Sequence, residues 1–446
     1  MQNGETTNNT ESDEQSLVYS WYIVFLCMIA YVFSFIDRTI VNLLVEPISA
    51  DLNLTDTQFS LIQGLAFALC YATMGIPIAR LADSKSRPLI ISLGICFWSI
   101  ATAACGVTKT FWQLFVARMG VGVGEAALSP AAYSMISDSF PKSKLGLALG
   151  VYSTGPFIGA GLAFFIGGTV IGYVSDFGIV DLPLLGIVKP WQMTFFIVGL
   201  PGVFIAALFF LTVRDPERKG IQNSNGFPIR EIVAYISTHR KTFASHYFGF
   251  GFLSLSLFAM LSWAAAFLIR KFGLSIPEVG NYLTIVVMFG NSAGVLCSGL
   301  LTDYFTRRGY ADAPLRSAMI GGLGGVIPAA MFSFIPDLHG ALFLLGLAMF
   351  FTSFPLATSA AALQLMAPNQ MRAQVTSLFF IFLNIIGITG GSTLVALCTD
   401  YVFVESTMVG YSMSLISSLA ALTGAVILFW GLKHFSATAD AVATGK

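Results

Sequence analysis

Residues 79–87 read ARLADSKSR, and residues 299–308 read GLLTDYFTRR. Each stretch follows a long apolar segment, and each places an aspartate at the end of that segment with an arginine four residues later. The two aspartates are 220 residues apart, about half of the chain, so the sequence predicts two related halves. One such pair alone would equally fit a solvated loop, but the repetition favours a gate. The predicted gating residues in these stretches are Asp83, Arg87, Asp303 and Arg307.

The segments around these stretches are too apolar for a soluble protein. The chain has 446 residues, of which 56% are hydrophobic and 10% are charged, and its mean hydropathy is +0.78. A soluble domain carries about 25% charged residues, which help to cover its surface. The formal net charge is zero, so we expect no nucleic-acid partner. The composition therefore indicates an integral membrane protein.

Twelve apolar segments are long enough to cross a bilayer as helices. About 20 mostly apolar residues are needed for one crossing, and a backbone in lipid must satisfy its hydrogen bonds within the segment. We predict an all-α polytopic membrane protein whose twelve transmembrane helices form two pseudo-symmetric six-helix bundles. The predicted spans are 21–46, 57–81, 88–107, 111–138, 144–173, 190–213, 243–271, 277–304, 313–335, 339–365, 370–398 and 406–434.

Lysine and arginine are distributed unevenly between the two ends of these helices. With both termini in the cytoplasm, 17 of the 23 face the cytoplasm and four face outside, in keeping with the positive-inside rule. The four outside are Lys109, Lys189, Arg270 and Lys271. The predicted parts of the chain are a disordered cytoplasmic tail at 1–20, an N-terminal bundle at 21–213, a cytoplasmic linker at 214–242 with a surface helix near 228–238, a C-terminal bundle at 243–434 and a cytoplasmic tail at 435–446.

Four charged residues lie well inside the predicted spans: Asp37, Arg38, Arg118 and Glu125. A charge near the bilayer centre costs at least ~2.5 kcal/mol on insertion scales, so such residues usually face a cavity or a partner. From the rise of ~1.5 Å per residue, Asp37 and Arg118 lie at nearly the same depth. We predict that Arg118 pairs with Asp37 or its neighbourhood in a water-reachable cavity. The alternative is a fixed ion pair that holds two helices together.

Glu125 follows Arg118 by seven residues, so it lies on the same helix face one heptad deeper. Because burial disfavours the charged form of a carboxylic acid, Glu125 would take up and release a proton as water access alternates. Arg38 has a rigid five-donor fork that suits a phosphate or carboxylate group; alternatively, it is a partner for Glu125. We predict proton coupling at Glu125 and Asp37, and substrate binding at Arg38, Arg118 and Glu125.

Uncharged residues complete the predicted site. Asn42, Gln63 and Tyr133 are polar side chains within spans, and we assign them to substrate binding, the alternative being hydrogen bonds between helices. Gly155 and Pro156 interrupt the fifth span, where proline removes a helical hydrogen bond. We assign this pair to gating, the alternative being a simple helix crossing. Because the second half has no charge well inside its spans, its side of the cavity should be apolar, which suits an amphipathic, lipid-like substrate.

Sequence features of other function classes are absent. The six cysteines lie in apolar segments without the spacing of metal ligands. The sequence has no nucleophile motif and no phosphate-binding loop. The four histidines are scattered near loops and span ends. We therefore expect no metal, no cofactor and no enzymatic activity.

The repeated stretch resembles the signature G-x-x-x-D-R-x-G-R-R of the major facilitator superfamily. In its first copy Asp83 and Arg87 remain, although four consensus residues are replaced. The replacing residues are Ala79, Ser84, Ser86 and Pro88. The run GPFIG at 155–159 resembles the Gly-Pro motif of antiporters in that superfamily.

Within the superfamily, the chain resembles the Spinster family and is similar to a bacterial Spinster homologue. The segments that carry this resemblance are 35–39, 61–64, 97–99 and 118–126. Spinster proteins are associated with transport of sphingolipids, sphingosine phosphates and lysophospholipids, and some members with proton coupling. The resemblance implies that Asp37, Arg38 and Glu125 handle substrate and protons.

The residues and the resemblance together predict a secondary active transporter that works by alternating access. We expect it to be proton-coupled and to move an amphipathic lipid-like substrate of the sphingolipid or lysophospholipid type. The alternative is a proton-coupled exporter of small organic anions or drugs. Its partners would be the substrate, protons and membrane lipids, and we expect a monomer in the plasma membrane, the inner membrane if the protein is bacterial.

Overall fold

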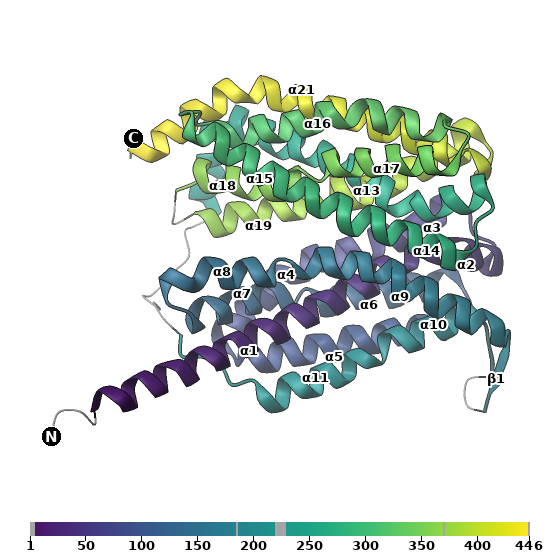
Figure 1. Cartoon of the computed structure of the whole chain (residues 1–446), viewed down its shortest axis with the longest axis horizontal. Helices are drawn as coiled ribbons and strands as arrows, with labels where there is room; N and C mark the ends of the chain where they lie inside the picture. Colours follow the sequence, from purple (N-terminus) through teal and green to yellow (C-terminus); the bar gives the residue numbers. More distant parts are fainter. Residues whose placement is uncertain (1–4, 184–185, 219–228, 369–370, 445–446) are drawn as a thin grey trace.

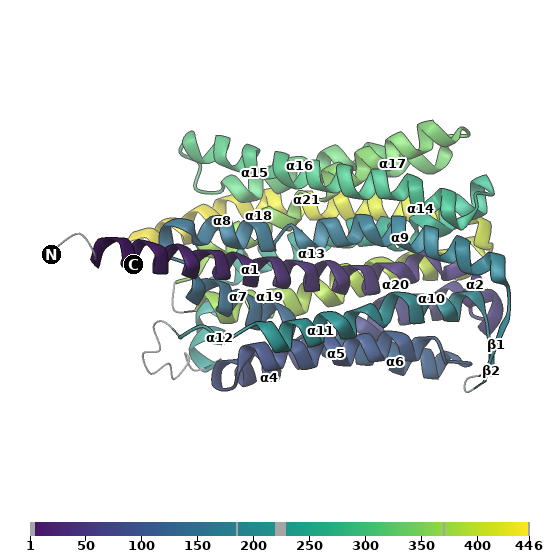
Figure 2. The ribbon, with the colours of Figure 1, turned by 60° about the horizontal axis from the view of Figure 1, so that its bottom comes forward.

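The computed structural model describes residues 5–183, 186–218, 229–368 and 371–444 of the chain. Long helices run roughly side by side, and the first half of the chain packs against the second as a separate bundle (Figure 1). The start of α1 and the end of α21 lie at the same end of the molecule (Figures 1 and 2). We call this the terminal end and the opposite one the distal end.

The first half contains six spans, several of which are made of more than one helix. Prolines stand in the first turn of α5, α9, α10 and α11, where a missing N–H costs no helical hydrogen bond. The spans are α1 (Glu5–Thr39) with η1 (Ile40–Leu43); α3 (Asp56–Ser60), η2 (Leu61–Leu65) and α4 (Ala66–Ser84); α5 (Arg87–Cys105); α6 (Phe111–Glu125) and α7 (Leu128–Ser139); α8 (Lys142–Tyr152) and α9 (Gly155–Phe177); α10 (Pro190–Gly199) and α11 (Pro201–Thr212). The connections include α2 (Val45–Leu52) and the hairpin of β1 (Val180–Leu182) with β2 (Gly186–Val188).

The second half repeats this arrangement after the surface helix α12 (Ile229–Thr238). Its spans are α13 (Arg240–Phe272); α14 (Ile276–Ile285), η3 (Val286–Asn291) and α15 (Ser292–Arg307); α16 (Ala313–Met331) with η4 (Phe332–Phe334); α17 (Leu338–Thr352) and α18 (Pro355–Met366); α19 (Arg372–Leu383), η5 (Asn384–Thr389), α20 (Gly390–Leu397) and η6 (Cys398–Phe403); η7 (Ser406–Met408) with α21 (Val409–Thr444).

Within the described residues, eleven helices are long and apolar enough to cross a membrane by length and composition. The fourth predicted span, which the structure divides at Ala126 and Ala127 into α6 and α7, is missing from that set. This span also carries Arg118 and Glu125, which lower its hydropathy. With α6 and α7 taken as one crossing, the predicted all-α fold of two six-helix bundles is confirmed.

The tail predictions need a correction. Residues 5–20, expected to be disordered, belong to α1. Neither glycine nor proline occurs between Glu5 and Thr39, so no strong helix breaker ends the helix as it leaves the bundle. Residues 1–4 of that tail, and 219–228 of the predicted linker, lie outside the described part of the chain. At the other end, α21 extends to Thr444.

Several spans at the interface between the two halves have interrupted helices. Turns of π-helix occur at η2, η3 and η5, in the second, eighth and eleventh spans. The fifth span is broken between α8 and α9. The second span packs against the eleventh, and α9 packs against α14. Since π-turns frequently occur at functional sites, these interruptions place the irregular backbone along the interface between the halves.

Candidate transport site

Glu125 and Arg38 form an ion pair between α6 and α1. The Nη2 of Arg38 donates to Oε2 of Glu125 at 2.6 Å, and Oγ of Ser34 donates to the same oxygen at 2.6 Å. Glu125 is only 2% exposed, whereas the Arg38 side chain is 17% exposed. Of the two sequence-based alternatives for Arg38, the structure therefore contains the pairing with Glu125.

Three aromatic rings surround the Arg38 guanidinium. Its Cζ lies 4.1 Å from the ring centroid of Phe67, 4.6 Å from that of Phe35 and 5.2 Å from that of Tyr71. The faces of such rings attract a cation. The rings therefore hold the Arg38 guanidinium in addition to its ion pair with Glu125.

Arg118 contacts Asp37, but through the main chain. Its Nη1 donates to the carbonyl oxygen of Asp37 at 3.1 Å, while the Asp37 carboxylate accepts from Oγ1 of Thr102 at 3.3 Å. The predicted pairing of Arg118 with Asp37 or its neighbourhood is present as this main-chain hydrogen bond, and within the described structure the two side chains form no ion pair with each other. The reason is local: α1 ends at Thr39 and gives way to a 3-10 turn, so carbonyls of its last turn are free to accept other donors.

The cluster is closed to water except at Arg38. Asp37 is 1% exposed and Arg118 is fully buried. Hydrogen-bond partners are lacking for Oδ1 of Asp37, Oε1 of Glu125, and Nε and Nη2 of Arg118. Of the four charged side chains only that of Arg38 is partly exposed, so the expected water-reachable cavity is not formed around Asp37, Arg118 and Glu125 in this conformation. The unpartnered atoms are able to form new bonds without first breaking others.

Asn42 and Gln63 connect the two halves. The Nε2 of Gln63 donates to Oδ1 of Asn42 at 2.6 Å and to the carbonyl of Ser262 at 2.9 Å. The Nδ2 of Asn42 donates to the carbonyl of Leu261 at 3.1 Å. Both side chains are buried. The sequence left two roles for these residues, substrate binding or hydrogen bonds between helices. In this conformation they make hydrogen bonds between helices.

Tyr133 stands at the exposed end of a row of aromatic rings. Its side chain is 41% exposed, and its ring meets that of Tyr152 edge-on at 5.1 Å. Tyr152 stacks on Tyr31 at 4.9 Å, and Tyr31 meets Phe35 at 5.5 Å. The row leads from an exposed ring on α7 to the ring beside Arg38. Tyr152, in the middle of the row, is fully buried.

Arg87 fixes the first repeated stretch within its own half. Its buried guanidinium donates to Asp215 at 2.7 Å, to Asp138 at 2.5 Å and to Ser134 at 2.9 Å. The side chain of Asp83 lies outside what the structure describes. These contacts join α5, α7 and the segment after α11.

The second repeated stretch is less constrained. Asp303 and Arg307 are exposed, and neither forms an ion pair with another described residue. The neighbouring Arg308 lies over the Tyr304 ring at 4.4 Å. The two copies of the repeat therefore differ, with the first anchored and the second solvated.

Gly155 and Pro156 begin α9 after the break at Ser153 and Thr154. A Cβ added to Gly155 would lie 3.0 Å from Cβ of Tyr31 on α1. Pro156 stands in the first turn of α9, so it starts a helix rather than removing a bond inside one. The pair thus allows α9 to approach α1 closely and to change direction relative to α8.

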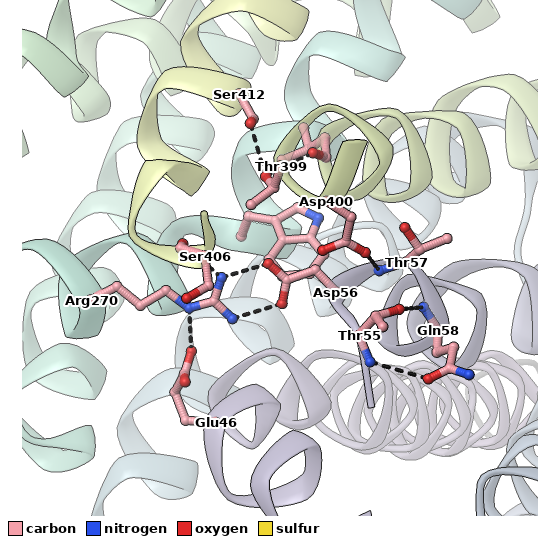
Figure 3. Close-up of polar contacts among 12 residues, drawn as sticks. Glu46, Thr55, Asp56, Thr57, Gln58, Arg270, Thr399, Asp400, Ser406 and Ser412 are labelled. Carbon is pink, nitrogen blue, oxygen red and sulfur yellow. Dashed lines mark hydrogen bonds and ion pairs between the residues drawn. The ribbon is translucent and has the colours of Figure 1, made fainter. Parts of the chain in front are cut away.

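One cluster at the distal end was missed by the sequence reasoning. Arg270, counted only as a charge facing outside, binds Glu46 and Asp56 of the other half (Figure 3). Its Nε lies 2.7 Å from Oε1 of Glu46, and its Nη1 lies 2.6 Å from Oδ2 of Asp56. The signal for this cluster in the sequence was weak. Arg270, Glu46 and Asp56 are charges of opposite sign at the ends of spans, and these ends were predicted to lie on the same side of the membrane.

Comparisons with known proteins agree with this architecture. The family model described as Major Facilitator Superfamily matches residues 27–391. An MFS-type efflux pump of Mycolicibacterium smegmatis is 27% identical over 83% of this chain and 82% of its own length. A probable L-galactonate transporter of Escherichia coli is 24% identical over 79% and 77% of the two chains. The human protein spinster homolog 1 is 26% identical over 56% of this chain and 46% of its own.

Solved structures share the fold. A bacterial homologue of the human lysosomal transporter Spinster, in an inward-facing and unoccupied conformation, superposes with a TM-score of 0.75. It is 24% identical, and the match covers 96% of this chain and 98% of that one. Its inward-facing, occupied form gives a TM-score of 0.71 at 25% identity. The match to the family model and the two-bundle fold identify the chain as a transporter of the Major Facilitator Superfamily that resembles a bacterial Spinster homologue.

Proposed function

We propose that this transporter is a secondary carrier that works by alternating access and moves an amphipathic organic anion of the sphingolipid or lysophospholipid type together with protons. The observation that carries the proposal is the ion pair of Arg38 and Glu125, in which only the cation is partly exposed. An anionic headgroup that reaches this pair meets Arg38 first and competes with Glu125 for it.

Competition for Arg38 couples the substrate to a proton. If an anion takes Arg38, Glu125 keeps its burial but loses its cation. A buried carboxylate without a cation favours its protonated form, so anion binding and proton uptake promote each other. Substrate and proton would therefore travel in the same direction. Asp37, equally buried and with one unpartnered oxygen, is a second place for the proton.

The surroundings of Arg38 support a lipid-like substrate. The aromatic row from Tyr133 to Phe35 supplies apolar surface next to a single cation. A molecule with one anionic group and an apolar tail matches that surface. Similarity to Spinster proteins supports the same substrate class, although the proposal for this chain rests on Arg38 and its rings.

We further propose roles for the remaining predicted residues in this conformation. Asn42 and Gln63 bind α13 and close the distal side, so access is from the terminal end, which we propose to be cytoplasmic. Arg87 would keep the first half rigid there, and Asp83 would support it. Asp303 and Arg307 would engage when that end closes, with Gly155 and Pro156 as the hinge. We propose a monomer in the plasma membrane, with bundles at 21–213 and 243–434.

A second candidate is a carrier or exporter of small organic acids or drugs. Relatives that match this chain over most of its length include an efflux pump and a probable L-galactonate transporter. A carboxylate would use Arg38 in the same way, but export driven by an inward proton gradient needs substrate and proton to compete. Thermal unfolding with a panel of lysophospholipids, sugar acids and drugs separates the candidates, since a true ligand stabilises the folded protein in a concentration-dependent manner.

The coupling is tested in proteoliposomes with a fluorescent lysophospholipid outside, whose uptake is measured as protection from extraction by albumin. We expect an acidic exterior to accelerate uptake by the parent protein. In Glu125→Gln, which mimics the protonated acid, this acceleration should disappear while uptake at equal pH persists. Glu405→Gln is the matched control, because Glu405 is an exposed carboxylate outside the site.

Equal acceleration in Glu125→Gln and the parent would refute the coupling role of Glu125. Faster uptake with an alkaline exterior would favour exchange of substrate for protons and thus the export alternative. Uptake of a sugar acid but of no lysophospholipid would replace the lipid-like substrate by the small anion.

A further inference from the structure

The first turn of the second span is held by two helices of the other half (Figure 3). This turn, at residues 55–58, begins α3. Arg270, in the last turn of α13, donates through Nη1 and Nη2 to both carboxylate oxygens of Asp56 at 2.6 and 2.7 Å. Asp400, in η6, accepts from the main-chain N–H of Thr57 at 2.7 Å. The two halves are thus tied by one charged pair and one main-chain contact on the same turn.

Arg270 makes four hydrogen bonds in this cluster. Besides Asp56, its Nε donates to Glu46 at 2.7 Å and its Nη1 to the carbonyl of Ser406 at 3.0 Å. The side chains of Arg270 and Asp56 are 8% and 6% exposed, whereas that of Glu46 is 35% exposed. A two-pronged pair between a guanidinium and a carboxylate is among the stronger charge-assisted contacts. Its burial makes it costly to break by removing one partner only.

The contact of Asp400 with Thr57 acts as a helix cap supplied by the opposite half. The first N–H groups of a helix have no partner within it. Thr55 satisfies that of Gln58 through its own side chain, and Asp400 satisfies that of Thr57. A carboxylate also suits the positive end of a helix. When the halves separate, the N–H of Thr57 loses its partner, while the cap by Thr55 remains.

We propose that Arg270 and Asp400 form a latch that holds the distal end closed and is released once in each transport cycle. The proposal rests on the alternating access proposed above and adds residues remote from Arg38 and Glu125. All four latch contacts of Arg270 and Asp400 on α2 and α3 run between the halves, so the distal end opens only if they break. The latch lies at the ends of the spans, where opening lets water solvate the separated charges, so its release is reversible.

The latch is tested by the distance between spin labels at the distal end. Labels replace the exposed Val107, after α5, and the exposed His339, in α17, in a full-length background whose six cysteines are substituted. Electron–electron double resonance then measures the ratio of separated to closed molecules. In Arg270→Gln we expect this ratio to rise about tenfold or more, since a buried pair loses one partner.

Lys271→Gln is the matched control. Lys271 is the next residue, also a cation, but its Nζ donates to the carbonyls of Ser333 and Ile335 within the second half. It should leave the distance distribution unchanged. The double variant Arg270→Gln/Asp56→Asn should add little to the single ones, because directly interacting residues are not additive.

An unchanged distribution in Arg270→Gln, or an equal rise in Lys271→Gln, would overturn the proposal. If Arg270→Gln does not fold, Asp400→Ala is measured in its place. A rise in the ratio of separated to closed molecules, smaller than the tenfold rise expected for Arg270→Gln, supports the latch, and an unchanged ratio refutes it. The readout needs no substrate. A rise in the ratio without lysophospholipid uptake by the parent protein would therefore contradict the proposed substrate and leave the latch standing.

Discussion

Arg38 is held by contacts of two kinds that a lysine cannot make together. Its planar fork donates to Glu125, and its face lies near the ring of Phe67. A lysine ammonium is a compact point charge on a flexible stem and offers neither a fork nor a flat surface. The identity of the cation, and not only its charge, should therefore matter for an anionic substrate.

We expect Arg38→Lys to raise the KM for the transported anion about tenfold, because charge-assisted hydrogen bonds are worth ~1.5–3 kcal/mol. Proton-driven acceleration should persist, since a cation still faces Glu125. Initial uptake rates at varied lysophospholipid concentrations measure both quantities. Arg80→Lys, an exposed cation at the end of α4, is the control. An unchanged KM in Arg38→Lys would remove Arg38 from substrate binding.

At the scale of helices, glycines set how closely α9 approaches α1. A Cβ on Gly159 would lie 2.6 Å from the carbonyl oxygen of Val32 and 2.7 Å from Cβ of Phe35. Both atoms belong to α1, and the carbonyl is main chain, so neither helix has a flexible side chain that could yield. Only glycine permits this spacing, which also positions Phe35 beside Arg38.

We expect Gly159→Ala to destabilise the protein by ~1–3 kcal/mol, the usual range for an overpacked site. Gly150, in α8 of the same span, has no neighbour within 4 Å of an added Cβ. Gly150→Ala should therefore be neutral or stabilising, since alanine favours a helix interior over glycine by ~1 kcal/mol. Thermal unfolding in detergent measures whether each variant is more or less stable than the parent protein. The same shift for both variants would mean that the close approach does not limit stability.

At the scale of the whole molecule, the distal contact between halves depends on two glycines. A Cβ on Gly280 of α14 would lie 2.5 Å from the carbonyl oxygen of Phe164 and 2.9 Å from Cα of Gly168, both on α9. Such an atom has no place unless α9 and α14 move apart. The contact lies on a different pair of spans from the Arg270 latch.

We expect Gly280→Ala to shift the protein toward conformations open at the distal end. Amide hydrogen exchange in α3 and η2 should become faster, because these elements pack against the second half only while that end is closed. Gly299→Ala is the control, because Gly299 lies in α15 and an added Cβ would have no neighbour within 4 Å. In this variant, amide hydrogen exchange in α3 and η2 should be as slow as in the parent protein. Equal exchange in Gly280→Ala would indicate that α9 and α14 separate without opening the distal end.

The sequence alone determined the twelve-helix, two-bundle fold and singled out the four charged residues within the first and fourth spans. These properties follow from composition and length, because each segment in lipid must satisfy its own backbone and span a known thickness. The repeat at 79–87 and 299–308 indicated the two halves for the same reason: it is a pattern along the chain. The fourth span was predicted at 111–138 from its own apolar stretch, although a break at Ala126 divides its helix.

Only the tertiary structure decided which groups meet. Arg118 contacts the carbonyl of Asp37 rather than its carboxylate, and Arg38 takes Glu125. Arg270 binds Asp56 although 214 residues separate them. A hydrogen bond depends on the rotation of each helix and on side-chain directions to within fractions of an ångström. Helix rotation and approach are set by packing between helices, which the order of residues along one span does not contain.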